Sequence, residues 1–173
     1  MEKSTKYLTY VATFVALTTL ANCLSLPVSG IQITFTYVPC FLAGIFLGPV
    51  AGFVAGAVGD VLGMLIMGFG PWLPLVTLSS GLLGFIPGII YKFVKIKNNE
   101  IKLLVSILAC LVICTAGLNT LGTFLVYGVG KKTYLAYLGA RLPVQCIMAA
   151  VNFVIIGILL RVKPLTKALT LKK

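Results

Sequence analysis

Apolar residues occupy most of this chain in long runs, which are separated by short segments rich in glycine, proline or lysine. Several runs extend for about 17 to 25 residues without a charged side chain, and a helix of that length crosses a hydrocarbon core of about 30 Å at 1.5 Å per residue. The pattern predicts an all-α membrane protein, with six transmembrane helices in one compact bundle that forms a single domain of residues 1–173. The predicted spans are residues 8–26, 35–48, 51–69, 75–93, 102–128 and 136–160.

The second and third predicted spans are separated only by Gly48-Pro49. Proline cannot continue a preceding helix, so this dipeptide predicts a sharp turn and a helical hairpin. Gly44, Gly48, Gly52 and Gly56 recur at four-residue spacing along the hairpin. Small residues at this spacing let helix backbones approach closely, which predicts tight packing inside the bundle. A moving or partner-facing surface is the alternative interpretation.

Composition supports the membrane assignment, since 60% of the residues are hydrophobic and only 10% are charged, against about 25% charged residues in soluble domains. Most of the basic residues that give the chain its net charge of +11 lie at the ends of the predicted helices. This placement favours a role in membrane topology over a nucleic-acid-binding surface. By the positive-inside rule, this distribution predicts that both termini are cytoplasmic. The basic groups are Lys3 and Lys6 before the first span, Lys92, Lys95, Lys97 and Lys102 between the fourth and fifth, and Arg161, Lys163, Lys167, Lys172 and Lys173 after the sixth.

The chain has no histidine, and Asp60 is the only carboxylate inside a predicted span. Serine–histidine hydrolysis, a His-Glu metalloprotease and a paired-aspartate protease each need groups that are missing here. We therefore predict a protein that is not an enzyme, without a cofactor or a metal site. Uphill transport would need ATP hydrolysis by partner subunits or an ion gradient, and one aspartate makes a sparse proton relay.

Asp60 and Arg141 are the two charges placed deepest in the predicted spans. Asp60 lies near the middle of its span, where a charge costs about 2.5 to 3.5 kcal/mol on insertion scales, so its side chain should face protein. Helix rise places Arg141 about 8 Å and Asp60 about 13 Å from the outer ends of their spans, close enough in depth to meet. One interpretation is an internal ion pair; the other is that Arg141 holds an anionic group of a ligand that enters from outside.

The outer connections have unusual compositions. Residues 27–34 alternate apolar and polar side chains, which predicts an extended flap. Residues 68–74 contain Trp72, the only tryptophan, between glycines and prolines. Tryptophan usually anchors a helix at the membrane interface, but here Trp72, or Phe69 nearby, could also stack on a flat ligand as part of a lid.

Polar residues inside the later spans outline a pocket near these predicted lids. Such residues either bond neighbouring helices or bind a ligand. The predicted ligand-binding residues are Arg141, Asn119, Trp72, Thr77, Ser79, Gln145 and Asp60.

The sequence contains Ala12-x-x-x-Ala16 in the first span and Gly48-Pro-x-x-Gly52-x-x-x-Gly56-x-x-x-Asp60-x-x-Gly63 in the hairpin. These motifs resemble those of the S components of energy-coupling factor (ECF) vitamin transporters. The segments around Thr77-Leu78-Ser79, Asn119-Thr120-Leu121, Leu125-Val126-Tyr127-Gly128 and Ala140-Arg141-Leu142 look most like the folate-type group. Gly122 departs from that group, where the resemblance implies a bulky aromatic residue.

The resemblance implies a multi-pass subunit of the cell membrane that binds a vitamin with high affinity outside and contains no nucleotide site. It implies docking through Ala12 and Ala16 on a T component, with two cytoplasmic ATPase subunits as further partners. Folate is the first expected substrate, because its carboxylates suit Arg141, and pantothenate is the second; an uncharged vitamin would leave Arg141 to pair with Asp60. A gradient-driven transporter that uses Asp60 and a structural or assembly factor are the alternative classes.

Overall fold

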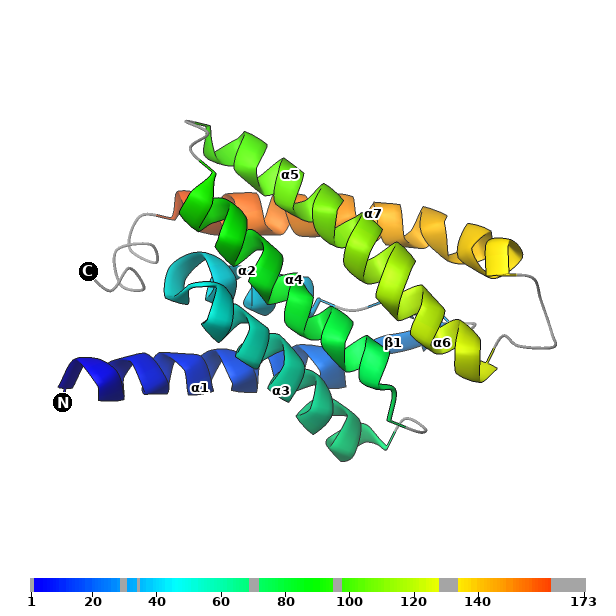
Figure 1. Cartoon of the computed structure of the whole chain (residues 1–173), viewed down its shortest axis with the longest axis horizontal. Helices are drawn as coiled ribbons and strands as arrows, with labels where there is room; N and C mark the ends of the chain where they lie inside the picture. The colour runs from blue at the N-terminus through cyan, green and yellow to red at the C-terminus, as the bar shows by residue number, and fades with distance from the viewer. Residues whose placement is uncertain are drawn as a thin grey trace.

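The computed structural model describes residues 2–28, 31–33, 35–68, 72–94, 98–127 and 134–162, and these are almost entirely helical (Figure 1). A π-helical segment, η1, joins two α-helices into one continuous rod, and two short strands form a ribbon. The elements are α1 (Glu2–Cys23), β1 (Leu26–Val28), β2 (Ile31–Ile33), α2 (Tyr37–Leu47), α3 (Pro49–Met67), α4 (Pro74–Phe93), α5 (Asn99–Cys110), η1 (Leu111–Asn119), α6 (Thr120–Tyr127) and α7 (Tyr134–Arg161).

Four helical segments of the described chain are long and apolar enough to cross a membrane. They are Pro49–Met67, Pro74–Phe93, Asn99–Val126 and Tyr134–Arg161, and each lies within a few residues of a predicted span. The second predicted span is the short apolar helix α2, whose 11 residues are only about 16 Å long. The first is found as α1, which begins six residues before the predicted span of 8–26 and is not among the four.

The predicted hairpin is confirmed at Gly48-Pro49. Gly48 has φ of 102°, a conformation that residues with a Cβ rarely adopt. Pro49 is the first residue of α3, where its missing N–H costs no helical hydrogen bond. The turn therefore reverses the chain between α2 and α3 with no intervening loop.

Three of the four glycines of the hairpin, Gly44, Gly52 and Gly56, are packed against α4, which confirms the predicted packing inside the bundle for these three; Gly48 forms the turn and has no atom within 4 Å of an added Cβ. A Cβ added at Gly44 would lie 2.0 Å from the carbonyl oxygen of Gly84, and one at Gly52 would lie 2.5 Å from the same atom. A Cβ at Gly56 would lie 2.1 Å from the Ser80 carbonyl oxygen. Only glycine permits this backbone approach, which brings α2, α3 and α4 together.

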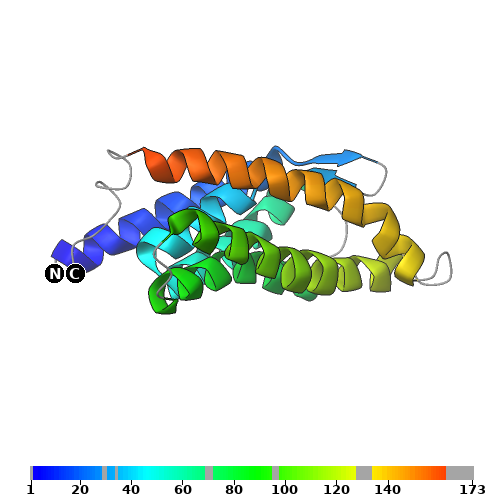
Figure 2. The ribbon, with the colours of Figure 1, turned by 90° about the horizontal axis from the view of Figure 1, so that it is seen from above.

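The remaining helices surround this centre. α3 also packs against α1, and α7 contacts α2, α5 and η1. The main apolar core lies between α2, α4, α5, η1 and α7, where Phe41, Leu103 and Ile156 are buried. The start of α1 and the end of α7 lie at one end of the bundle, and the β1–β2 ribbon lies toward the other (Figure 2).

For the described residues 27, 28 and 31–33, the ribbon confirms the extended conformation that was predicted for residues 27–34. β1 and β2 pair antiparallel, with Leu26 opposite Ile33 and Val28 opposite Ile31. Other predictions fall on residues that the structure does not describe, namely Phe69 in the second lid and the lysines at positions 95, 97, 163, 167, 172 and 173. For Lys3, the helical backbone is described and the side chain is not.

Candidate functional site

A small polar cavity lies between α1, α2, α3, α4, η1 and α7, toward the end of the bundle that carries the ribbon. Its volume is about 50 Å³. Side chains from six different elements converge on it, although the sequence is overwhelmingly apolar. The lining residues are Asn22, Thr36, Tyr37, Asp60, Val76, Ser79, Ser80, Leu83, Thr115, Asn119, Arg141 and Gln145.

Asp60, on α3, is held by two hydroxyl groups of α4. Thr77 donates a hydrogen bond of 2.8 Å to one carboxylate oxygen, and Ser80 donates one of 3.1 Å to the other. These donors replace part of the solvation that a carboxylate loses when it is buried. α4 therefore fixes the direction of the Asp60 side chain in the cavity.

Thr77 also connects the cavity to the loop that precedes α4. The indole N–H of Trp72 donates a 3.0 Å hydrogen bond to the Thr77 hydroxyl. Trp72 is 55% exposed, and neither Trp72 nor Thr77 lines the cavity directly. The two residues thus act on the site through Asp60 in this structure.

Arg141, on α7, is the cation of the cavity and is only 6% exposed. Its Nη1 donates a hydrogen bond to the hydroxyl of Thr123 on α6. Thr123 in turn donates to the Asn119 carbonyl at 2.9 Å, so the guanidinium is tied to the end of η1. The side chain is positioned by α6 as well as by its own helix.

Asp60 and Arg141 line the same cavity but do not pair with each other. Within the described residues, the only ion pair joins Arg161 and Glu100 at the far end of the bundle. The structure therefore does not form the internal ion pair that the sequence left open. The negative charge of Asp60 is met by hydroxyl donors of α4 instead.

The π-helical segment places two polar residues in the cavity. Thr115 and Asn119 both line it, four residues apart in a helix with more residues per turn than an α-helix. Ser79 donates a 2.9 Å hydrogen bond to the Cys114 carbonyl, and the hydroxyls of Tyr37 and Thr115 are hydrogen-bonded to each other. π-Helical turns occur frequently at functional sites, and here one faces the polar cavity.

Five of the seven predicted ligand-binding residues meet in this cavity, and two lie outside it. Trp72 and Thr77 are the two that lie outside, and they are linked to the cavity by their hydrogen bonds to each other and to Asp60. Ala12 and Ala16, the predicted docking residues, are exposed on α1. The five that meet are Asp60, Ser79, Asn119, Arg141 and Gln145.

Sequence reasoning missed several lining residues at the ends of α1 and α2. Thr36 donates a 2.7 Å hydrogen bond to Asn22, whose amide donates to the Gly59 carbonyl at 3.3 Å. An amide in an apolar helix is a usable signal, because polar residues in membrane helices face protein. Tyr37 and Thr115 gave no such signal, since either is common in membrane helices.

Gly122, the departure from the folate-type pattern, does not line the cavity. A Cβ at this position would lie 3.0 Å from the Cβ of Leu75 and 3.4 Å from Cγ2 of Val76. Gly122 therefore lets α6 pack closely on the start of α4, and a bulky aromatic side chain would not fit there without displacing α4.

The family model described as "ECF-type riboflavin transporter, S component" matches residues 2–171. The chain belongs to this family of ECF S components. An S component is a membrane-embedded, substrate-binding subunit of a vitamin transporter and not an enzyme, which agrees with the helical fold and the buried polar cavity.

This S component is also similar to individual proteins. It is 30% identical over 133 residues to "Folate transporter FolT" from Clostridium novyi (strain NT), an alignment that covers 77% of this chain and 74% of that protein. The crystal structure of FolT bound with folic acid has a TM-score of 0.74 and 26% identity, covering 87% of this chain and 91% of that one. The S component for biotin from an ECF-type ABC transporter shares the fold, with a TM-score of 0.66 at 20% identity and coverage of 90% of each chain.

Proposed function

We propose that this S component captures folate from outside the cell for ATP-driven import. The observation that carries the proposal is the buried Arg141 in a polar cavity. Folate carries carboxylates on its glutamate group, and arginine binds carboxylates through two parallel hydrogen bonds. The similarity to FolT from Clostridium novyi and to FolT bound with folic acid supports the same substrate.

Binding of folate requires the cavity to open. Sites for ligands of drug size enclose about 300 to 1,000 Å³, whereas this cavity encloses about 50 Å³. Two successive hydrogen bonds, from Trp72 to Thr77 and from Thr77 to Asp60, link the loop before α4 to the cavity. We therefore assign the residues around Trp72, together with the β1–β2 ribbon, to the lids that admit the vitamin and close over it.

The distribution of basic residues supports the orientation. Lys6, Lys92, Lys102 and Arg161 lie on the segments of α1, α4, α5 and α7 at the end of the bundle away from the cavity. The positive-inside rule places that end in the cytoplasm, with both termini. In this arrangement α1, α2 and the four longer segments make six crossings of the cell membrane, and the cavity opens outward.

Ala12 and Ala16 are proposed as the docking face for a T component, which works with two ATPase subunits. α1 turns Phe14 and Thr18 into the bundle, where they are buried, and leaves both alanines exposed. Small exposed residues at four-residue spacing suit close approach by another membrane helix. ATP hydrolysis would take place in the partner subunits.

Native mass spectrometry of the purified protein with its co-purified ligand tests the substrate. A folate mass in a one-to-one complex is the expected result, because nanomolar binding survives purification. A riboflavin mass, as the family description suggests, or a pantothenate mass would keep the S-component assignment and overturn folate. A protein that stays empty after incubation with each of these vitamins would contradict vitamin capture.

Flux measurements separate this function from gradient-driven transport. In liposomes, the chain alone should bind folate without accumulating it under a proton or sodium gradient. Uptake should require a T component, two ATPases and ATP. Flux by the chain alone that disappears in an Asp60→Asn variant would instead establish Asp60 as an ion-coupling residue.

A further inference from the structure

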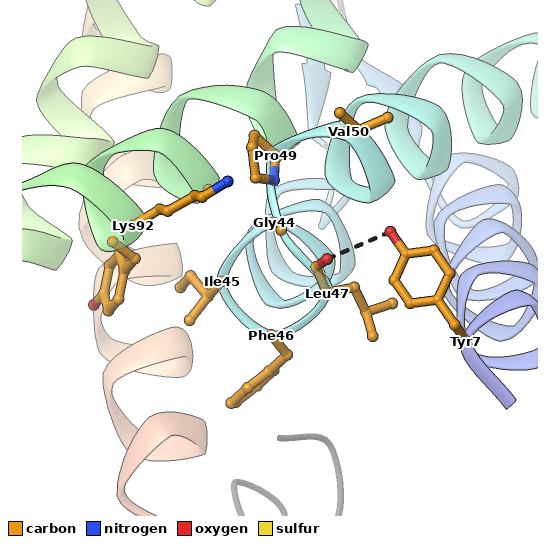
Figure 3. A pocket seen from close by; sticks show the side chains of 11 residues that line it. Tyr7, Gly44, Ile45, Phe46, Leu47, Pro49, Val50 and Lys92 are labelled. Atoms are coloured by element: carbon orange, nitrogen blue, oxygen red, sulfur yellow. Dashed lines mark hydrogen bonds between the residues drawn. The ribbon is translucent and has the colours of Figure 1, made fainter. Parts of the chain in front are cut away.

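A second, larger cavity lies at the opposite end of the bundle from the vitamin site. Its volume is about 460 Å³, and it is bounded by the start of α1, the turn from α2 to α3 and the end of α4 (Figure 3). Tyr7 closes one side, where its hydroxyl donates a 3.4 Å hydrogen bond to the Leu47 carbonyl. We call this space the basal cavity; no part of the vitamin-binding scheme uses it.

The basal cavity is positively charged. The Lys92 side chain extends across it toward Pro49 (Figure 3). Lys102 adds a second cation nearby, 5.7 Å from the ring centre of Tyr91, which lines the cavity. The one ion pair of the described residues joins Arg161 and Glu100, so no described carboxylate pairs with Lys92. The helix ends add no net positive charge, because the first turn of α3 faces this space with the positive end of its dipole while the last turns of α2 and α4 face it with negative ends. The positive charge of the cavity therefore comes from the lysine side chains.

An apolar groove continues from the basal cavity along the outside of α3 and α4. Val50 lines both spaces, and the groove is completed by Phe53, Leu82 and Phe85, with a volume of about 290 Å³. The rings of Phe53 and Phe85 meet edge to face, 6.2 Å apart. Val50 is the lining residue that the two spaces share, so the charged pocket borders an apolar groove. From Lys92 to Leu82, α4 rises about 15 Å.

We propose that the basal cavity and this groove form a binding site for a phospholipid with an anionic headgroup. The phosphate lies against Lys92, and one acyl chain lies in the groove past Val50 and across the paired rings of Phe53 and Phe85. A charged pocket joined to an apolar trough matches an amphiphile, and basic pockets between membrane helices recognise anionic headgroups in this way. Val50 is 68% exposed on the side of the helix pair that the bilayer would cover. This site does not depend on the identity of the vitamin.

Native mass spectrometry with phosphatidylglycerol and phosphatidylcholine of identical acyl chains tests the headgroup. We expect phosphatidylglycerol to be retained with roughly fivefold preference, and Lys92→Gln to remove that preference while Lys92→Arg keeps it. Lys6→Gln is the matched control, because it removes the same charge one residue from Tyr7 without lining the cavity. Equal losses in Lys92→Gln and Lys6→Gln would overturn the site and leave only general surface attraction.

Two further measurements test the lipid as the occupant. Val50→Trp fills the groove and should release phosphatidylglycerol in a variant that still binds its vitamin and melts like the parent protein. Inorganic phosphate at millimolar concentration should not displace the lipid; if it does, the pocket binds free phosphate and the proposal fails. The proposal also fails if Lys92→Gln leaves lipid retention unchanged but prevents assembly with the T component, because the occupant is then an acidic partner protein.

Discussion

The hydroxyl of Thr77 bonds the carboxylate of Asp60 at 2.8 Å while it accepts the indole N–H of Trp72 at 3.0 Å. One side chain of α4 thus joins an exposed aromatic residue of the loop to the only carboxylate in the cavity lining. A loop movement that displaces Trp72 must either break its hydrogen bond to Thr77 or move the Thr77 side chain with it.

Thr77→Val removes this connection without a large change in volume. We expect the emission of Trp72, the only tryptophan, to shift in the absence of ligand, because its N–H loses its acceptor. Asp60 also loses one of its two donors, which should lower stability by about 1 to 3 kcal/mol. Fluorescence and thermal unfolding in detergent measure the two effects. The control is Thr13→Val, which removes an exposed hydroxyl bonded only to the Thr9 carbonyl; it should change neither the emission nor the stability. Unchanged Trp72 emission in Thr77→Val would contradict the hydrogen-bonded link from Trp72 to Asp60.

Arg141→Ala should weaken folate binding by about 2 to 5 kcal/mol, because a ligand carboxylate would be left in the cavity without its cation. Isothermal titration calorimetry measures this loss. Arg141→Lys should recover only part of the affinity, since an ammonium cannot form the two parallel hydrogen bonds. A loss of less than tenfold in Arg141→Ala would exclude Arg141 from carboxylate recognition.

Thr123→Val tests whether the hydroxyl that bonds Arg141 positions the guanidinium for binding. Hydrogen bonds to charged groups contribute about 1.5 to 3 kcal/mol, so we expect affinity to fall by roughly 10- to 150-fold, measured by the same calorimetry. Thr120→Val is the matched control in the same helix, because its hydroxyl bonds only the Thr115 carbonyl. If both variants lose affinity equally, the effect comes from the helix and not from the position of Arg141.

Ala12→Phe combined with Ala16→Phe should leave folate affinity unchanged and abolish uptake by the assembled transporter. Both alanines are exposed and distant from the cavity lining, so bulk there blocks approach of a partner helix without touching the ligand. Binding and uptake are measured on the same preparation. Leu17→Phe, on an adjacent exposed part of α1, is the control; collapse of affinity in the double variant would assign this face to folding.

Gly84→Ala should destabilise the bundle strongly, because the added Cβ would lie 2.2 Å from the Gly52 carbonyl oxygen. Overpacking costs about 1 to 3 kcal/mol and more where backbone must move. Gly139→Ala is the control, since no atom lies within 4 Å of a Cβ there, and it should be neutral or stabilising by up to about 1 kcal/mol. Similar melting temperatures for the two variants would refute the close helix contact.

The linear sequence was sufficient for the features that depend on local pattern. Runs of apolar residues mark helices because the bilayer excludes unbonded backbone, and Gly48-Pro49 marks the turn because each residue restricts its own dihedral angles. Alternation in residues 27–34 indicated the ribbon for the same local reason. The polar residues in apolar spans identified five members of the cavity, because such residues are costly unless they face protein.

Only the tertiary structure decided which of these polar groups meet. Spacing along a helix places Asp60 and Arg141 at similar depths but does not set their rotation about separate axes, and the packing directs Asp60 to Thr77 and Ser80 instead. The π-helical turn that brings Thr115 into the cavity also has no local signature, since it depends on how η1 packs against α4 and α7. The basal cavity arises where α1, α2, α3 and α4 come together, so no single segment of the sequence contains its pattern.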